Sequence, residues 1–326
     1  MLALRRFQAL EDAYKIVFLP SSHSFFTDTA LLLAARAGRP FGLMPSLFSE
    51  EPLCVQLGPL CDYLPFHAAS WVNPDLYAAA ATTKSIDLLM LASFARVKRH
   101  WRLFEALSRL PSSYRVVVAG FPLGGRTEHD VRREARAFGV EDRIEIVVDP
   151  GQEAIRELLA QTKLFCAMSH REGSYISVAE ALMAGAPVAA FANARFGTKA
   201  YVNRQTGVLL DPTRDLAAQL RDAVEHHDQF APAAWARENI SARVNCPKLN
   251  RVLAAQASHR GEAWTRSIKP FYRIRFEFIY YDGDEAEAEL ADDYQRIRQD
   301  FGLTIVRPVT EPDSREPRTP RVFQSA

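Results

Sequence analysis

Apolar runs and amphipathic segments alternate regularly through the middle of the chain. The runs have the length of buried strands, and the segments between them repeat apolar positions at helical spacing. The predicted strands are 86–91, 115–119, 143–148, 164–168 and 188–191. The predicted helices are 98–110, 127–138, 151–161 and 174–184. Repeated strand–helix units imply a parallel sheet with helices on both faces, which binds ligands at the carboxyl ends of its strands.

One strand–turn–helix unit carries the strongest local signals. Glu172-Gly173-Ser174 reads as a turn after an apolar strand, and apolar positions at helical spacing follow it. Ser174 suits the N-cap of the predicted helix and Gly185 its C′ position. Pro187 ends the helix before the next strand.

This unit also has the residues of an anion site. A Gly-Ser turn before a helix presents the backbone N–H groups of Gly173 to Tyr175 and the positive end of the helix dipole, which suit phosphate. Glu172 precedes the first turn, and Glu180 lies about two turns further along. A partly buried Glu180 needs hydrogen-bond donors, which a ribose diol would supply. An ordinary strand–turn–helix unit with Glu180 on the surface fits the same pattern.

Two segments resemble a known family. Glu172-Gly173, followed by Glu180-Ala-Leu-Met-Ala-Gly-Ala-Pro-Val188, resembles the donor-site signature of retaining glycosyltransferases with the GT-B fold, the family-four-like group known as glycosyl transferases group 1. The segment 205–212, Gln-Thr-Gly-Val-Leu-Leu-Asp-Pro, resembles the Thr-Gly-x-Leu-x-x-Pro segment of that family. The resemblance implies transfer of a sugar from a UDP- or GDP-sugar with retention. It also implies that the reaction uses no metal and no cofactor other than the nucleotide sugar.

The resemblance assigns roles to residues of this chain. Glu180 would hold the ribose, and Glu172 would contact the transferred sugar as a catalytic residue. Lys98 matches the lysine that holds the diphosphate, whereas Ser93 stands where the family has arginine. Arg96 could supply the missing charge, because a guanidinium is long and bidentate. A solvated basic helix start without a ligand is the alternative interpretation of the same residues.

Further donor contacts are predicted from position alone. In this fold the nucleobase rests against loops after later strands, which implicates Gly120 and Val148. No side chain identifies the base. His23 and His67 are the histidines before the interdomain linker, and neither falls where a family histidine approaches the sugar.

The expected fold class is α/β and GT-B-like. It combines a Rossmann-like parallel-sheet donor domain with a reduced N-terminal α/β segment and a helical C-terminal extension. The expected parts are a partial acceptor-type domain (1–72), a linker (73–84), the nucleotide-sugar-binding domain (85–230), C-terminal helices and extension (231–306), and a disordered tail (307–326). The first part is about half as long as an acceptor domain needs, so we expect a truncated or reduced domain.

Composition and charge exclude several classes of protein. Forty Lys and Arg against 39 Asp and Glu leave a net charge of +1, so no global field attracts nucleic acid. No apolar run approaches the roughly 20 residues of a membrane span. The start of the chain lacks a signal peptide's apolar stretch, and the cysteines follow no metal spacing. We expect a cytoplasmic protein, with peripheral contact at the inner membrane as an alternative.

Two short patterns in the C-terminal extension are weaker indications of function than the donor-site motifs. Asp282-Gly283-Asp284 resembles a metal-binding Asp-x-Asp motif, but it lies outside the strand–helix repeats and just before a predicted helix, where acids favour the dipole. The aromatic and basic run 269–275 forms no clean amphipathic helix, so packing against the first domain is favoured over membrane contact. We therefore predict no metal site.

Three functions remain open. The leading hypothesis is a hexosyltransferase in glycan or polysaccharide synthesis, with a glycan, lipid or protein as the acceptor. A protein that only binds the nucleotide sugar, or that needs a partner subunit, fits the short first domain and Ser93. A sugar-nucleotide epimerase of the same fold is the third hypothesis.

Overall fold

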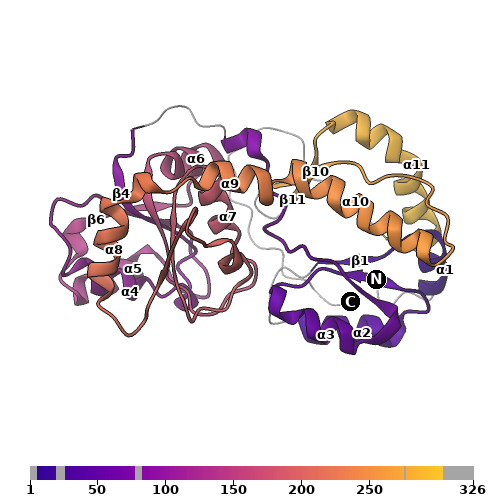
Figure 1. The fold of residues 1–326 in the computed structure, drawn as a ribbon, viewed down its shortest axis with the longest axis horizontal. Coiled ribbons are helices and arrows are strands. Elements are labelled where there is room, and N and C mark those ends of the chain that lie inside the picture. Colours follow the sequence, from indigo (N-terminus) through magenta and orange to yellow (C-terminus); the bar gives the residue numbers. More distant parts are fainter. Residues whose placement is uncertain (1–5, 20–25, 78–82, 275–276, 304–326) are drawn as a thin grey trace.

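Two lobes, each built on a parallel sheet, lie side by side in the computed structural model of the chain (Figure 1). The structure describes residues 6–19, 26–77, 83–274 and 277–303. The predicted tail and His23 lie outside these residues, as does part of the predicted linker.

The larger lobe contains a six-stranded parallel sheet in the order β6-β5-β4-β7-β8-β9. Its strands are β4 (Ile86–Leu91), β5 (Val116–Gly120), β6 (Ile144–Val148), β7 (Thr162–Ala167), β8 (Val188–Phe191) and β9 (Gly207–Leu210). Every residue of β4 is buried, because helices cover both faces of the sheet and the central strands have no solvent-facing side. The predicted α/β class and the parallel sheet are confirmed.

Five helices cover this sheet. They are α4 (His100–Leu107), α5 (Glu128–Ala137), α6 (Gln152–Ala160), α7 (Ile176–Met183) and α8 (Leu216–Glu225). The predicted helix from residue 98 begins later, because a 3₁₀ turn, η5 (Arg96–Lys98), precedes it and Arg99 has a left-handed backbone with φ 59°. The end of α7 forms the predicted glycine cap: Gly185 has φ +83° and donates to Leu182 O, while Ala186 N–H donates to Ala181 O.

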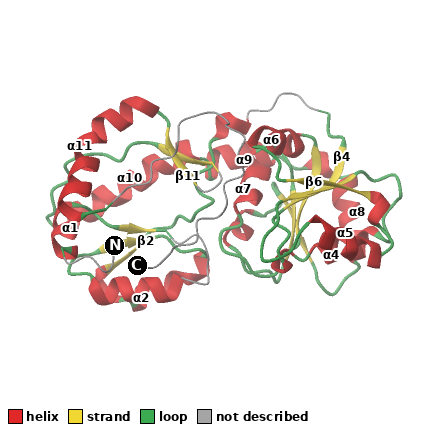
Figure 2. Cartoon of the chain, turned by 180° about the vertical axis from the view of Figure 1, so that it is seen from behind, coloured by secondary structure: helices red, strands yellow, loops and turns green. Residues whose placement is uncertain are grey.

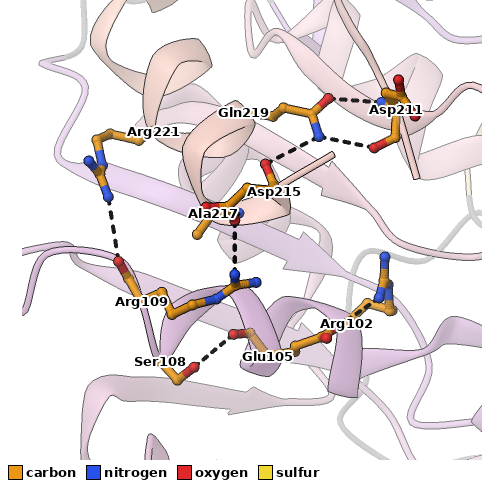
Figure 3. Close-up of polar contacts among 9 residues, drawn as sticks. All are labelled: Arg102, Glu105, Ser108, Arg109, Asp211, Asp215, Ala217, Gln219 and Arg221. Atoms are coloured by element: carbon orange, nitrogen blue, oxygen red, sulfur yellow. Dashed lines mark hydrogen bonds and ion pairs between the residues drawn. The ribbon is translucent and has the colours of Figure 1, made fainter. Parts of the chain in front are cut away.

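The turn from β9 into α8 shows how one of these helices is fixed to the lobe (Figure 3). Asp215 caps α8 by accepting from Ala217 N–H at 3.0 Å, and its carboxylate also pairs with Arg109 after α4 at 3.1 Å. The Gln219 side chain spans the turn, accepting from Asp211 N–H and donating to Asp211 O. These contacts fix the start of α8 against the end of β9 and the end of α4.

The smaller lobe contains a three-stranded parallel sheet, β1 (Val17–Phe18), β2 (Phe41–Leu43) and β3 (Cys61–Tyr63). Its N-terminal helices are α1 (Phe7–Ala13), α2 (Phe26–Arg36) and α3 (Glu51–Gln56). Figure 2 shows the sheet lying between α2 on one face and α10 with α11 on the other. The C-terminal part of the chain therefore completes the lobe that the N-terminal part begins.

The C-terminal part returns to the smaller lobe through two helices. They are α9 (Pro232–Asn239) and α10 (Ala242–His259), and buried Leu249 and Leu253 of α10 pack with Leu64 and Trp71. A hairpin of β10 (Phe271–Ile274) and β11 (Glu277–Tyr280) follows, and then α11 (Gly283–Phe301). No helix in the described ranges is long and apolar enough to span a membrane.

Candidate functional site

The turn after β7 lies at the carboxyl edge of the large sheet and is held by the loop after β8. Glu172 N–H donates to Arg195 O at 3.0 Å, and Gly197 N–H donates to Gly173 O at 2.9 Å. Thr198 N–H donates to Ser174 O at 3.2 Å. These bonds fix the backbone that carries Glu172.

Lys98 and Glu172 meet across this edge. Lys98 Nζ lies 2.7 Å from Glu172 Oε1, and the two side chains are 16% and 14% exposed. Ser169 Oγ donates to the same carboxylate oxygen at 2.7 Å, and Lys98 Nζ lies 4.6 Å from the centre of the Tyr175 ring. The structure thus brings together both predicted catalytic side chains, one from the loop after β4 and one from the loop after β7.

Ser174 does not cap α7, contrary to the prediction. The helix begins at Ile176 with Tyr175 as the N-cap residue, which has a left-handed backbone with φ 53° and makes no side-chain cap. Ser174 Oγ instead accepts from Ala68 N–H at 3.2 Å, which joins the turn to the smaller lobe. The first turn of α7 consequently has no side-chain cap to compete with an anion.

Glu180 is half-buried and has partners from two distant segments. Tyr77 Oη donates to Glu180 Oε1 at 3.2 Å from η4 (Pro74–Tyr77), and burial beside this carboxylate raises the pKa of Tyr77 well above 10. Burial lowers the pKa of Arg273 in β10, while the charge of Glu180 opposes that shift. On a neighbouring face of α7, Ser177 Oγ donates to Leu91 O at the end of β4. Sequence reasoning did not find Tyr77 or Arg273, because both are far from Glu180 along the chain.

The basic residues after β4 take different positions. Arg96 is exposed and lines a hollow of about 410 Å³ together with Arg126. His100 is fully buried, and burial together with the charges of Arg126 and Lys98 lowers its pKa to about 3. A neutral buried imidazole packs in the core, so His100 adds no charge to the basic residues Arg96, Lys98 and Arg99 beside it. Arg126, which pairs with Glu134 at 3.3 Å and whose charge also acts on His100, is a cation that the sequence analysis missed.

Ser93, Gly120 and Val148 all lie near the carboxyl edge of the sheet. Ser93 is buried, and its hydroxyl has no hydrogen-bond partner among the described residues. A Cβ on Gly120 would lie 1.9 Å from Ala92 O, so close approach of two strands requires the glycine. Val148 is 41% exposed at the end of β6, which leaves an apolar surface where a base could rest.

His67 is part of the junction between the lobes. It is fully buried, its Nδ1 accepts from Ala69 N–H at 3.2 Å, and its ring stacks on Tyr201 with centroids 5.1 Å apart. Burial lowers its pKa to about 3, so the ring is neutral. The structure gives His67 a packing role between the lobes.

Within the described ranges, no group of three or more His, Cys, Asp or Glu side chains could hold a metal ion. Asp282 and Asp284 lie at the start of α11, where acids interact favourably with the helix dipole.

The fold is shared with solved structures of other proteins. HepE of Anabaena, solved in complex with UDP and glucose, superposes with a TM-score of 0.59 at 18% identity, covering 78% of this chain and 74% of that chain. Sucrose-phosphate synthase of Thermosynechococcus elongatus superposes with a TM-score of 0.60 at 15% identity, covering 77% of this chain and 71% of that chain. Both likenesses establish the fold, which is that of GT-B glycosyltransferases.

The sequence comparison gives the family. Residues 78–238 match the profile described as "Glycosyl transferases group 1", so this domain of the chain belongs to that glycosyltransferase family. A relative from Komagataeibacter xylinus, named GDP-mannose:cellobiosyl-diphosphopolyprenol alpha-mannosyltransferase, is 31% identical over 169 residues. That match covers 51% of this chain and 39% of the relative. The chain therefore spans well under half the length of this curated relative.

Proposed function

We propose that the chain transfers a sugar from a nucleoside-diphosphate sugar to an acceptor with retention of configuration. The main observation in support of this proposal is the Lys98–Glu172 pair, with Nζ 2.7 Å from Oε1, which lies beside the uncapped start of α7. The cation suits the diphosphate of such a donor, and the carboxylate beside it suits the sugar. Lys98 would turn to the diphosphate, and Glu172 would accept from hydroxyl groups of the sugar.

In this mechanism the charge that develops on the leaving diphosphate is stabilised by groups already in place. Lys98 supplies a full charge, and the N–H groups of Gly173 to Tyr175 supply dipoles. Glu172 would stabilise the positive charge that grows at the anomeric carbon. In this proposal Glu172 forms no covalent bond with the sugar, and the nucleotide sugar is the one co-substrate.

Glu180 would bind the ribose in this proposal. Its carboxylate is held by the Tyr77 hydroxyl at 3.2 Å and lies near the charge of Arg273, so its position is set before the donor arrives. A carboxylate has about four acceptor positions, which leaves capacity for a diol. The exposed Val148 and the end of β5 at Gly120 would carry the base, and Arg96 and Ser93 would lie near the phosphates.

The names of the relatives support proposals for the donor and the acceptor. The Komagataeibacter relative is named for GDP-mannose, and HepE was solved with UDP, so we propose either a GDP-sugar or a UDP-sugar as the donor. The name of the former also supports a role in polysaccharide synthesis and a lipid-linked acceptor, with glycan or protein as alternatives. We infer that the reaction takes place in the cytoplasm, with peripheral contact at the inner membrane as an alternative.

A second function is supported by one observation. Ser93 replaces the arginine that the family resemblance predicts, and its buried hydroxyl has no partner among the described residues. A chain with a weakened diphosphate site could bind the nucleotide sugar without transferring it, or need a partner subunit to do so. Sugar transfer by the purified chain alone would exclude this alternative.

The first test is the thermal shift of the purified chain with UDP, GDP, UDP-glucose and GDP-mannose. Ligand binding raises the midpoint by mass action, and we expect a shift with one base that is lost in Glu180→Ala. Glu157→Ala is the matched control, because Glu157 is an exposed residue of α6. A folded wild type that shifts with none of the four ligands would refute donor binding. For a chain that binds and transfers a sugar, the anomeric configuration of the product tests retention.

A further inference from the structure

A hollow of about 450 Å³ lies between the two lobes, away from Lys98 and Glu172. Its lining comes from the smaller lobe, the donor lobe and α10. The residues that matter for its chemistry are Phe48, Phe66, Tyr201, Asn245, Lys248 and Arg251. None of them belongs to the predicted donor site.

The floor of the hollow is polar and rigid. The hydroxyl groups of Tyr201 and Ser70 lie 3.1 Å apart, and Asn245 Nδ2 donates to Ser70 O at 2.8 Å. All three side chains are buried, with exposed fractions of 6% for Tyr201, 1% for Ser70 and 5% for Asn245. A network of buried hydrogen bonds fixes the shape of the hollow before any ligand arrives.

Two cations line the hollow without acidic partners. Lys248 and Arg251 are three positions apart on α10, so they share one face of the helix. Both are exposed, and neither forms an ion pair with an acidic residue in the described part of the chain. The sequence of α10 contains no Asp or Glu, and the carboxylate of Asp75 pairs with Arg243 instead. An anion would therefore find two unpaired donors here.

The hollow is also joined to the donor turn. Tyr201 ends the 3₁₀ helix η7 (Gly197–Tyr201), and Gly197 N–H donates to Gly173 O at 2.9 Å. The aromatic rings of Phe48 and Tyr201, with centroids 6.2 Å apart, offer apolar surface beside the cations. A sugar ring has apolar C–H faces, and such faces pack well against aromatic rings.

We propose that this hollow binds the anionic group of the acceptor, a carboxylate or a phosphate borne on a sugar ring. Lys248 and Arg251 pair with the anion, and Phe48 and Tyr201 contact the ring. Charge-assisted hydrogen bonds of this kind are about twice as strong as neutral ones. The inference rests on the proposed transferase function, because it identifies the chemical class of the second substrate.

The test is titration calorimetry of the full chain with glucose 6-phosphate, glucuronate and glucose. We expect at least one anionic sugar to bind about tenfold more tightly than glucose, because two charge-assisted contacts are added. The double variant Lys248→Gln/Arg251→Gln should lose that preference, and Arg243→Gln should keep it. Preference for the phosphate or for the carboxylate identifies which anion the acceptor carries.

Two results would overturn the inference: no binding of either anionic sugar to the wild type, or equal binding by the wild type and the double variant. UDP and GDP are titrated into the same proteins. A wild type that binds an anionic sugar but no nucleotide contradicts the proposed donor site alone. One that binds a nucleotide but no anionic sugar contradicts the inference about the hollow alone.

Discussion

Replacing Glu172 by glutamine should tighten the binding of a free nucleoside diphosphate. Lys98 Nζ is 2.7 Å from Glu172 Oε1, so a diphosphate that recruits Lys98 must first separate this pair. Glutamine keeps the shape of the side chain and removes its charge. Because Glu172 would hold the sugar and not the diphosphate, its charge opposes the binding of a free nucleoside diphosphate, which carries no sugar.

The magnitude follows from the geometry. Two unit charges 2.7 Å apart attract by about 1.5 kcal/mol at the dielectric constant of water and about 6 kcal/mol at an effective value of 20. The side chains are only 16% and 14% exposed, so desolvation offsets much of the larger figure. We take the net attraction as about 1–2 kcal/mol, which corresponds to roughly 5- to 30-fold tighter binding of the diphosphate.

The assay is calorimetric titration of UDP and GDP into the wild type, Glu172→Gln and Lys98→Met. Lys98→Met should weaken binding, and Glu172→Gln should strengthen it while it lowers turnover of the intact nucleotide sugar. Glu145→Gln removes an equal charge from an exposed pair on β6 and controls for the change in net charge. Unchanged or weaker binding of both diphosphates by Glu172→Gln would refute the assignment of Lys98 to the diphosphate.

Two further predictions concern stability. Gly120→Ala places a Cβ 1.9 Å from Ala92 O and should lower the free energy of unfolding, measured in urea, by about 1–3 kcal/mol. Gly151→Ala, which has open space around it, should change this free energy by less than about 0.5 kcal/mol. Equal effects of the two substitutions would contradict the packing argument. His67 and His100 have folded pKa values lowered from 6.5 to about 3, so the unfolded chain binds more protons between these values. The free energy of unfolding should therefore fall as the pH drops from 6.5 toward 3, by up to about 1.4 kcal/mol per pH unit for each histidine. The measurement is urea unfolding at pH 7.5 and at pH 5.5. Two curves that coincide would show that the rings are not buried and neutral.

The strands of the larger lobe could be predicted because their signal is local. Fully buried parallel strands read as continuous apolar runs, and β4 and β5 are buried along their whole length. The meeting of Lys98 with Glu172 also followed from topology, since residues after neighbouring parallel strands come to the same edge. Their roles needed the family resemblance, because spacing alone does not distinguish a donor site from a solvated helix start.

The errors have a common cause, which is packing and burial that the local sequence pattern does not show. Ser174 has the composition of an N-cap, but its hydroxyl accepts from Ala68, 106 positions away, and Tyr175 takes a left-handed backbone instead. His100 looks like a member of a basic run, but tertiary packing buries it among aromatic rings such as Phe94 and Phe104. Local patterns report what a residue can do, and the tertiary environment selects among those uses.

The surroundings of Glu180 extend this argument beyond the family domain. The family match ends at residue 238, whereas Arg273 of β10 lies near enough to Glu180 for their charges to interact. Arg273 N–H also donates to Trp71 O at 2.8 Å, so the hairpin is fixed to the segment that leads to Tyr77. Tyr77 holds the same carboxylate. Two segments outside the donor sheet, one before it and one after it, thus contribute to the surroundings of the residue to which we assign the ribose, and the donor site that we propose includes the C-terminal hairpin.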